Sequence, residues 1–453
     1  MEENILELIQ GKNYTRLRTH LSQMNPADIA LILEDVPSKD LLVIFRILPK
    51  ESAAEVFVEM DSDMQQMLIE AFSDAELRAV LDELFLDDAV DIIDEMPATV
   101  AKRIIKQADS DTRKQINQLL AYPDESAGSI MTTEYIDLKK DMTVDEAFDR
   151  IRAVGLDSET IYTCYVTDKS RRLQGIVSVK ELLLSDKTAV LSDIMDCNII
   201  FANTLDDKED VADKFQKYDL VAMPVVDKED RLVGIITVDD AIDVMVEEAT
   251  EDIEKMAAIL PSDKSYFKTG VISTFKARIP WLMLLMISAT FTGAIISSFE
   301  SKLTAVPALI AFIPMLMDTA GNCGSQSSVT VIRSISLGDI EFKDILRVLW
   351  KELRVAFICS LALAAVNFVK LWLVDNLLLG TFDTGKQLLQ IAVVCVTQFF
   401  TVIVAKAVGC MLPIIAKKLG FDPAVMASPF ITTIVDAISL AIYFAIAILL
   451  LSV

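Results

Sequence analysis

The residue that most needs a chemical explanation is Asp436, in the apolar closing stretch SPFITTIVDAISLAIYFAIAILLLSV. It is the only charged side chain after Asp422. A carboxylate in hydrocarbon is costly, so such residues usually face a cavity, a partner or an ion. No basic residue shares its segment, and Lys406 lies on the preceding one. A mobile cation is therefore the favoured counter-ion, and a protonated structural aspartic acid is the alternative.

A second apolar stretch, FIPMLMDTAGNCGSQSSVTVIRSIS, carries polar groups that lipid would not tolerate, namely Asp318, Asn322, Ser325 and Gln326. These groups must pack against protein or line water. Pro314, Gly321 and Gly324 can bend the helix and free backbone carbonyls. Small residues also mediate close helix packing, but glycines combined with amides and an acid favour the lining of a water-filled path.

A third candidate is the acidic stretch VDDAIDVMVEEATEDIEKMAAIL. As a helix it places one acidic stripe at spacings of three and four, with three more acids beside it and only Lys255 to offset them: Asp240, Asp243, Glu247, Glu251 and Glu254, then Asp239, Glu248 and Asp252. Like charges at this spacing destabilise a helix. Divalent cations that prefer oxygen ligands, or a basic partner, would neutralise the stripe, and a solvated face is the alternative.

Asp87 and Asp91, at i and i+4 in FLDDAVDIIDEM, form a smaller acidic pair. For this pair a solvated helix face is the more ordinary interpretation.

Other chemistry is excluded by composition. The chain has one histidine, His20, and six cysteines without a CxxC motif. Histidine-based zinc sites, a histidine-centred triad and the HExxH helix of a metalloprotease are therefore unavailable, and no zinc knuckle is indicated. The sequence predicts a protein that is not an enzyme.

The elements that position these residues follow from charge and hydropathy. Residues 1–262 carry 27 Lys and Arg against 56 Asp and Glu, whereas residues 263–453 carry 15 against 11. Beyond Arg278, several stretches approach the roughly 20 apolar residues that cross a bilayer. We expect a soluble acidic body followed by five transmembrane helices.

Positive charge is concentrated before the first expected span and in alternate loops: Lys264, Lys268, Lys276, Arg278, Arg333, Lys343, Arg347, Lys351, Arg354, Lys417 and Lys418. By the positive-inside rule, the N-terminal body is cytoplasmic and the C-terminus lies outside.

Four segments are expected. Residues 1–125 read as short amphipathic helices that stack into an acidic α-superhelix. Residues 126–238 contain a duplication, about 126–185 and 186–238, in which VTDKSRRLQGIVSVKELL is echoed by VVDKEDRLVGIITVDDAI at an offset of 59. Residues 239–262 form the acidic connecting helix, and residues 270–453 form the membrane domain.

The duplicated segment resembles a tandem pair of α/β CBS domains, which commonly sense adenosyl ligands or ions. Thr237 and Asp240 match that family's ribose-contacting T-x-x-D pattern, and Ser178 and Glu181 are the weaker match in the first copy. The resemblance implies that ATP can bind to the pair, although many CBS pairs bind no nucleotide.

The order of parts resembles the MgtE family of magnesium channels, which is related to solute carrier family 41. The resemblance rests on the superhelix, the CBS pair, the acidic helix and five spans with P-x(6)-G-N-x-G-x-Q and a late TTIVD. It implies a homodimeric Mg²⁺ channel with a pore on the dimer axis, a connecting helix that plugs it, and cytoplasmic domains that sense Mg²⁺.

The resemblance also implies site residues. The pore ligands fall on Asp436, on Asp422 near the cytoplasmic mouth, and on Asn322. The regulatory metal ligands fall on Glu55, Asp87, Asp91, Ser129, Asp219, Asp240, Asp243, Glu248, Glu251 and Asp252. Ser325, Ser428 and Ala320 depart from the family's usual Asn, Asn and Gly, so the contacts around a hydrated ion are expected to differ there.

The sequence thus predicts a Mg²⁺ influx channel of the bacterial cytoplasmic membrane, gated by internal Mg²⁺, with a second copy and the bilayer as partners and no nucleic acid. The alternatives are a channel for Mn²⁺, Co²⁺ or Ca²⁺ and a membrane-anchored CBS nucleotide sensor. Oxygen ligands do not separate Mg²⁺ from Mn²⁺.

Overall fold

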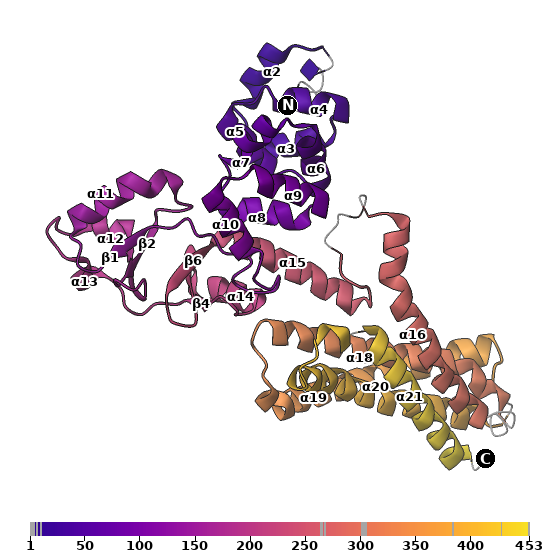
Figure 1. The fold of residues 1–453 in the computed structure, drawn as a ribbon. Coiled ribbons are helices and arrows are strands. Elements are labelled where there is room, and N and C mark those ends of the chain that lie inside the picture. The colour runs from indigo at the N-terminus through magenta and orange to yellow at the C-terminus, as the bar shows by residue number, and fades with distance from the viewer. Residues whose placement is uncertain are drawn as a thin grey trace. The chain divides into compact units, whose positions relative to one another are not determined.

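The structure is a computed structural model that describes residue 5 and residues 8–9, 11–262, 266, 269–299, 306–382, 385–426 and 428–451, without the side chains of Glu51 and Ser428. The chain divides into two compact units, Met1–Val246 and Glu247–Val453 (Figure 1). The helix α15 (Val238–Met256) crosses the division between them.

The first unit begins with short helices of eight to ten residues each: α2 (Tyr14–Leu21), α3 (Pro26–Glu34), α4 (Ser38–Phe45), α5 (Lys50–Val58), α6 (Ser62–Ala71), α7 (Asp74–Leu81), α8 (Leu86–Glu95), α9 (Ala98–Gln107) and α10 (Ser110–Leu119). Most begin at a proline or at a side-chain cap, such as the Ser73/Glu76 capping box of α7. Helices α3, α5, α7 and α9 contact one another in succession, as do α4, α6 and α8. This stacking is the predicted superhelix.

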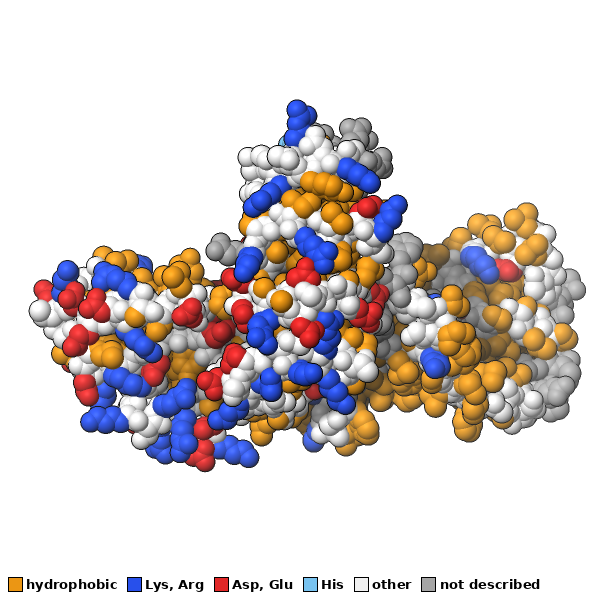
Figure 2. Space-filling view, turned by 45° about the horizontal axis from the view of Figure 1, so that its top comes forward, with side chains coloured by type: hydrophobic (Ala, Val, Ile, Leu, Met, Phe, Trp, Pro, Cys, Tyr) orange, Lys and Arg blue, Asp and Glu red, His pale blue; other side chains and the backbone are white. Residues whose placement is uncertain are grey.

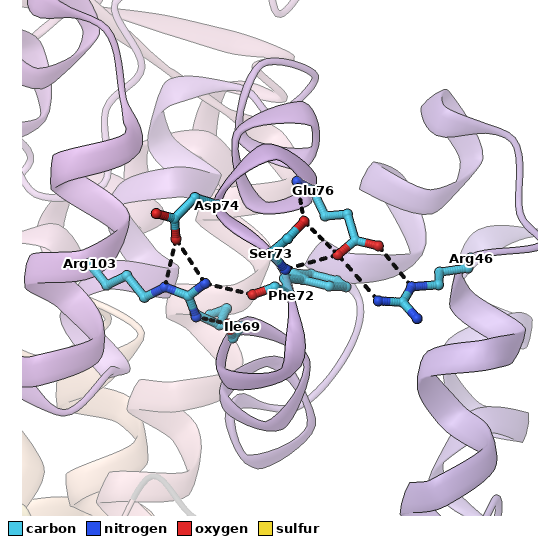
Figure 3. Close-up of polar contacts among 7 residues, drawn as sticks. All are labelled: Arg46, Ile69, Phe72, Ser73, Asp74, Glu76 and Arg103. Carbon is cyan, nitrogen blue, oxygen red and sulfur yellow. Dashed lines mark hydrogen bonds and ion pairs between the residues drawn. The ribbon is translucent and has the colours of Figure 1, made fainter.

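An arginine fixes one turn of the superhelix (Figure 3). Arg103 on α9 donates to the backbone oxygens of Ile69 and Phe72, at the C-terminal end of α6, and forms an ion pair of 3.1 Å with Asp74 at the start of α7. A cation at the C-terminus of one helix complements its dipole, and the acid complements the N-terminus of the next. One side chain therefore joins three helices.

The duplicated segment contains two three-stranded sheets of identical order. The first comprises β1 (Asp137–Lys139), β2 (Thr163–Thr167) and β3 (Leu173–Ser178), and the second comprises β4 (Ala202–Asn203), β5 (Ala222–Val226) and β6 (Leu232–Thr237). In each sheet the first pair is parallel and the second antiparallel. The register Thr163↔Ser178 recurs as Ala222↔Thr237, the offset of 59 read from the sequence.

Helices flank these sheets: α11 (Val144–Val154), α12 (Val179–Leu184), α13 (Leu191–Ile194) and α14 (Lys208–Tyr218). The two halves meet through an Arg172↔Arg231 bridge and through Tyr135, whose hydroxyl donates to the Leu232 carbonyl. Each half therefore completes the other.

The second unit is helical: α16 (Val271–Ser298), α18 (Ile313–Ser336), α19 (Ile345–Lys370), α20 (Gln387–Lys418) and α21 (Ser428–Leu451), with a π-helix at Leu371–Leu378 and short 3₁₀ turns at Pro307–Phe312, Phe342–Asp344 and Ala424–Met426. Within the described residues, four segments are long and apolar enough to cross a membrane, and they contain α16, α19, α20 and α21. The remaining one of the five predicted spans is α18, which has 24 residues but carries the polar groups noted above.

Helix α18 packs against both α20 and α21, so it has protein neighbours on two sides. On the face drawn in Figure 2, charged side chains are spread over the N-terminal unit and hydrophobic side chains dominate the helical unit. This contrast is the one that the sequence charges predict.

Candidate cation pathway and regulatory sites

Asp436 lies on α21, half-buried, within electrostatic range of Asp318 on α18. Asp318 begins a stripe at i+4 spacing whose members are exposed in the single chain: Asp318, Asn322, Gln326 and Thr330. Residues four apart lie on one helix face. Two carboxylates and a row of amide and hydroxyl groups are thus available to a hydrated cation.

The glycines of α18 serve packing rather than the stripe. A Cβ at Gly321 would overlap the Thr432 side chain on α21, and a Cβ at Gly409 on α20 would overlap the Gly324 backbone oxygen. Close approach of small residues is the usual way that membrane helices associate. Gly321 and Gly324 therefore have the packing role that the sequence left as the alternative. The neighbouring polar residues face outward.

Lys406 is engaged by residues other than Asp436. It is buried on α20, donates to Ser327 Oγ at 3.1 Å and lies 3.9 Å from Glu352 on α19. Ser327 in turn donates to Glu352 at 2.7 Å. This network joins α18, α19 and α20 and leaves Asp436 without a basic partner among the contacts that the structure describes.

Asp422 lies in the loop between α20 and α21. One carboxylate oxygen accepts from the Ala424 N–H at 2.7 Å, and the other lies 2.7 Å from Lys255 Nζ at the end of α15. Asp252 accepts a long hydrogen bond of 3.4 Å from Ser336 at the end of α18. Burial and then the Asp422 charge raise the pKa of Asp252.

In the first unit, Asp87 is buried, with 8% of its surface exposed. The expectation of a solvated face is therefore wrong for this residue. Its pKa is raised well above the ordinary value, first by burial and then by the charges of Asp240 and Glu159. Burial likewise raises the pKa of Asp240 to about 6. The structure thus brings α8 and the first turn of α15 together through two predicted ligands.

The same cluster contains acidic residues that the sequence did not predict as ligands. Burial and neighbouring acids raise the pKa of Asp88 to about 6 and that of Glu159 to about 8, and burial raises that of Glu134. Asp239 and Glu59 add repulsion at Asp88. Only Asp88, adjacent to Asp87, could have been found from the local pattern, since Glu134, Glu159 and Glu59 come from distant segments.

The other predicted ligands are more scattered. Glu55, Asp91, Asp219 and Asp243 are exposed, and Glu248 and Glu251 are half-buried along α15. Ser129 donates to the carbonyls of Asp124 and Ser126. Ser428 begins α21, but its side chain lies outside the described residues.

The T-x-x-D pattern forms a helix cap. Thr237 donates its hydroxyl to Asp240 Oδ2 at 2.6 Å, and its N–H approaches the same oxygen at 3.3 Å. Ser178 and Glu181 make the same two contacts in the first half, and there the Glu181 N–H also donates to Ser178 Oγ, which completes a capping box. The motif therefore has a structural role in starting α15 and α12.

In the part of the chain that the structure describes, no three His, Cys, Asp or Glu side chains are grouped to hold a directly coordinated ion. Pairs of carboxylates suit Mg²⁺ nonetheless, because this ion usually keeps several waters and touches one or two carboxylates.

Comparison with known proteins decides the family. A profile described as "Divalent cation transporter" matches residues 313–446, the MgtE intracellular N domain matches 24–125, and CBS domains match 127–186 and 191–247. The magnesium transporter MgtE of Thermus thermophilus is 35% identical over 459 residues, which cover 100% of this chain and 99% of that protein. The chain belongs to the MgtE family.

Other MgtE proteins agree. The magnesium transporter MgtE of Bacillus subtilis is 32% identical, with 98% of this chain and 96% of that protein covered, and that of Enterococcus faecalis is 35% identical, with 75% and 72% covered. As an MgtE protein the chain is a multi-pass membrane transporter and not an enzyme. The family resemblance read from the sequence is confirmed.

Solved structures support the soluble fold. A crystal structure of the cytosolic domain of the Mg²⁺ channel MgtE in complex with ATP matches with a TM-score of 0.52 at 34% identity, and covers 54% of this chain and 100% of that one. The soluble part of a magnesium transporter matches with a TM-score of 0.51 at 29% identity, covering 55% and 98%. The predicted fold class, a superhelical domain and CBS pair before a helical membrane domain, is confirmed.

Proposed function

We propose that this MgtE protein is a Mg²⁺ channel whose ion path runs past Asp436. The observation that carries the proposal is that Asp436 lies within electrostatic range of Asp318 and has no basic partner among the described contacts. Carboxylates in a membrane domain without a fixed counter-ion favour a mobile one. The stripe that contains Asn322 supplies oxygen atoms that accept hydrogen bonds from the water molecules around the ion. Mg²⁺ gives up these water molecules reluctantly.

The pore forms between two copies of the chain. The polar stripe of α18 is exposed in the single chain, and polar groups of this kind do not face lipid. A two-fold axis beside the stripe would cover it with its own copy and bring two Asp436 side chains to one ion. Homodimerisation is thus part of the proposal.

The first unit and α15 lie in the cytoplasm, and the C-terminus lies outside, as the distribution of Lys and Arg favours. Influx is driven by the membrane potential, which contributes about 2.3 kcal/mol per charge per 100 mV, or roughly twice that for a divalent ion.

Internal Mg²⁺ closes the channel by neutralising the acidic cluster. Asp87, Asp88, Asp240 and Glu159 repel one another in a partly buried site. An ion stabilises the assembled cluster only to the extent that it binds the assembled form more tightly than the separated form. Without the ion, repulsion loosens α15 and opens the path.

ATP is proposed as a further ligand of the CBS pair, because a relative's cytosolic domain crystallised with ATP. Asp240 belongs both to the T-x-x-D pattern and to the acidic cluster. Nucleotide binding would therefore be coupled to cation binding through this residue.

The test is Mg²⁺ uptake into liposomes that contain the full-length protein and a Mg²⁺-sensitive dye, at low and high internal Mg²⁺. We expect Asp436→Asn to abolish uptake, because the substitution removes the charge but keeps the shape. Asp339→Asn is the matched control, since Asp339 is exposed in the loop after α18. Undiminished uptake by Asp436→Asn would overturn the pore assignment.

Replacing Mg²⁺ by Mn²⁺, Co²⁺ or Ca²⁺ in the same assay tests the other divalent ions. A lack of flux for every ion in wild type, together with ATP binding, would favour the sensor alternative.

A further inference from the structure

Lys255 connects the last turn of α15 to the loop before α21. Its ammonium lies 2.7 Å from Asp422 Oδ2 and 2.7 Å from Glu251 Oε1, one turn earlier on its own helix. The three side chains are 23%, 33% and 34% exposed, in the order Lys255, Asp422 and Glu251. The contact is therefore sheltered, and its geometry is that of two charge-assisted hydrogen bonds.

The surrounding contacts hold this turn in place. Met256 packs against Ile332 of α18 and Ala424 of the turn before α21. The Leu260 N–H donates to the Ala277 carbonyl of α16 at 3.0 Å. The end of α15 is thus docked on the helical unit by apolar and backbone contacts, with Lys255 as the central charge.

The local charge balance explains why a lysine is needed. Glu251 precedes Lys255 by four residues, Asp252 by three, and Glu254 by one, while Asp422 faces it from the loop. Glu254 is occupied by the Ser262 N–H at 3.0 Å. Without the ammonium, the carboxylates of Glu251 and Asp422 would face each other with nothing between them, and like charges at this distance repel.

The electrostatic balance at Lys255 favours the charged form. Burial alone would lower the pKa of Lys255, but the hydrogen bonds to Asp422 and Glu251 outweigh it and raise that pKa.

We infer that Lys255 is a positioning residue, a tethered cation that docks the acidic helix on Asp422 independently of Mg²⁺ and thereby sets how much internal Mg²⁺ closes the channel. This inference rests on the proposed function. A Mg²⁺ ion at the acidic cluster then acts on a helix whose last turn is already held, so closure needs less ion than repulsion between the acids alone would require.

The first experiment measures Mg²⁺ uptake into liposomes by full-length wild type and Lys255→Met over a range of internal Mg²⁺. We expect Lys255→Met to need about fivefold or more internal Mg²⁺ for half-closure, with an unchanged maximal rate. Lys255→Arg should restore closure near the wild-type concentration, because it keeps the charge.

The matched control is Lys417→Met, since Lys417 lies near Asp422 in the sequence and is exposed. We expect its half-closing concentration to equal that of wild type. If Lys255 instead only competed with Mg²⁺ for Asp422, Lys255→Met would close at lower internal Mg²⁺. That result, or an unchanged half-closing concentration, would overturn the inference.

A second measurement does not depend on transport. Hydrogen exchange of residues 247–256 in the full-length detergent-solubilised protein, with EDTA, should be faster in Lys255→Met than in wild type and Lys255→Arg. Equal exchange in all three would contradict the docking role. If wild type carries no Mg²⁺ but this difference is present, the proposed function fails while the docking role stands.

Discussion

At the scale of single residues, the first unit uses carboxylates in two opposite ways. Glu76 accepts two hydrogen bonds from Arg46, at 2.8 and 3.3 Å, and caps α7 through Ser73 (Figure 3). These hydrogen bonds, from Arg46 first and Ser73 next, lower the pKa of Glu76 to about 2. Asp87, by contrast, is buried among acids that raise its pKa. The first arrangement stabilises the fold, and the second stores repulsion that a cation can relieve.

The stabilisation from Glu76 should disappear in acid. Because its folded pKa lies below the ordinary value of 4.5, its contribution is present above about pH 4.5 and is lost as the pH falls toward 2. We expect Glu76→Gln to cost about 1 kcal/mol or less at pH 7, since the 36% exposed side chain is screened by solvent. Urea unfolding of residues 1–246 at pH 7 and pH 3 measures the difference, which should shrink at pH 3.

Glu83→Gln is the control for this titration, because Glu83 is exposed beyond the end of α7. A cost of Glu76→Gln that stays constant between the two pH values would contradict the assignment.

The effect of Asp87 on stability should depend on whether a cation is bound. With EDTA, we expect Asp87→Asn to leave residues 1–246 as stable as wild type or more stable, because a buried charge among like charges is removed. With Mg²⁺ at about 100 times its dissociation constant, wild type should gain about 2.7 kcal/mol and the variant much less. Thermal unfolding with and without Mg²⁺ measures both effects.

Asp94→Asn on the same helix is the matched control, since Asp94 is exposed. A full Mg²⁺ stabilisation in Asp87→Asn would exclude Asp87 from the cation site.

At the scale of elements, α18 has two faces with different roles. Its glycines allow close contact with α20 and α21, while Asp318, Asn322 and Gln326 remain on the open face. The sequence interpretation treated both sets as one pore-lining signal. The helix instead places packing and polar groups on different sides, so each set can be altered without the other.

Gly409→Ala should loosen the contact between α18 and α20. Its Cβ would meet the Gly324 backbone, which cannot rotate away, and overpacking of this kind costs roughly 1–3 kcal/mol. We expect a lower melting midpoint for the detergent-solubilised protein. Gly293→Ala on α16 is the control, because its Cβ meets open space and alanine favours the helix; equal midpoints for the two variants would refute the close contact.

At the scale of the whole molecule, α15 is the element that matters most, because it begins in the CBS pair and ends in the helical unit. Its first turn carries Asp239 and Asp240 of the acidic cluster, and its last turn carries Lys255. In the proposed gating, α15 is therefore the helix through which a cation bound near its first turn would act on its last turn.

The orientation across the membrane gives a separate prediction. Cys197 is exposed in the first unit and, if that unit is cytoplasmic, a membrane-impermeant maleimide should label it only after the cells are permeabilised. In a Cys197→Ser background, Leu379→Cys, in the exposed loop after α19, should be labelled in intact cells. Labelling of Cys197 in intact cells would reverse the proposed orientation.

Much of this architecture could be predicted from local sequence. The repeat offset predicted that the two sheets pair their strands in the same register, because each half carries the same strand pattern. The apolar stretches predicted the long helices. The isolated charge of Asp436 singled it out as a candidate for the proposed cation path, because composition alone makes a membrane carboxylate exceptional.

Tertiary structure decided the rest, because electrostatics depends on distance in space. Only the fold shows that Asp87 is buried, that Glu134 and Glu159 join Asp88 from distant segments, and that Lys406 is committed to Glu352. In the sequence, Lys255 is only the single positive charge that offsets an acidic stripe. The fold shows that it also forms the ion pair with Asp422.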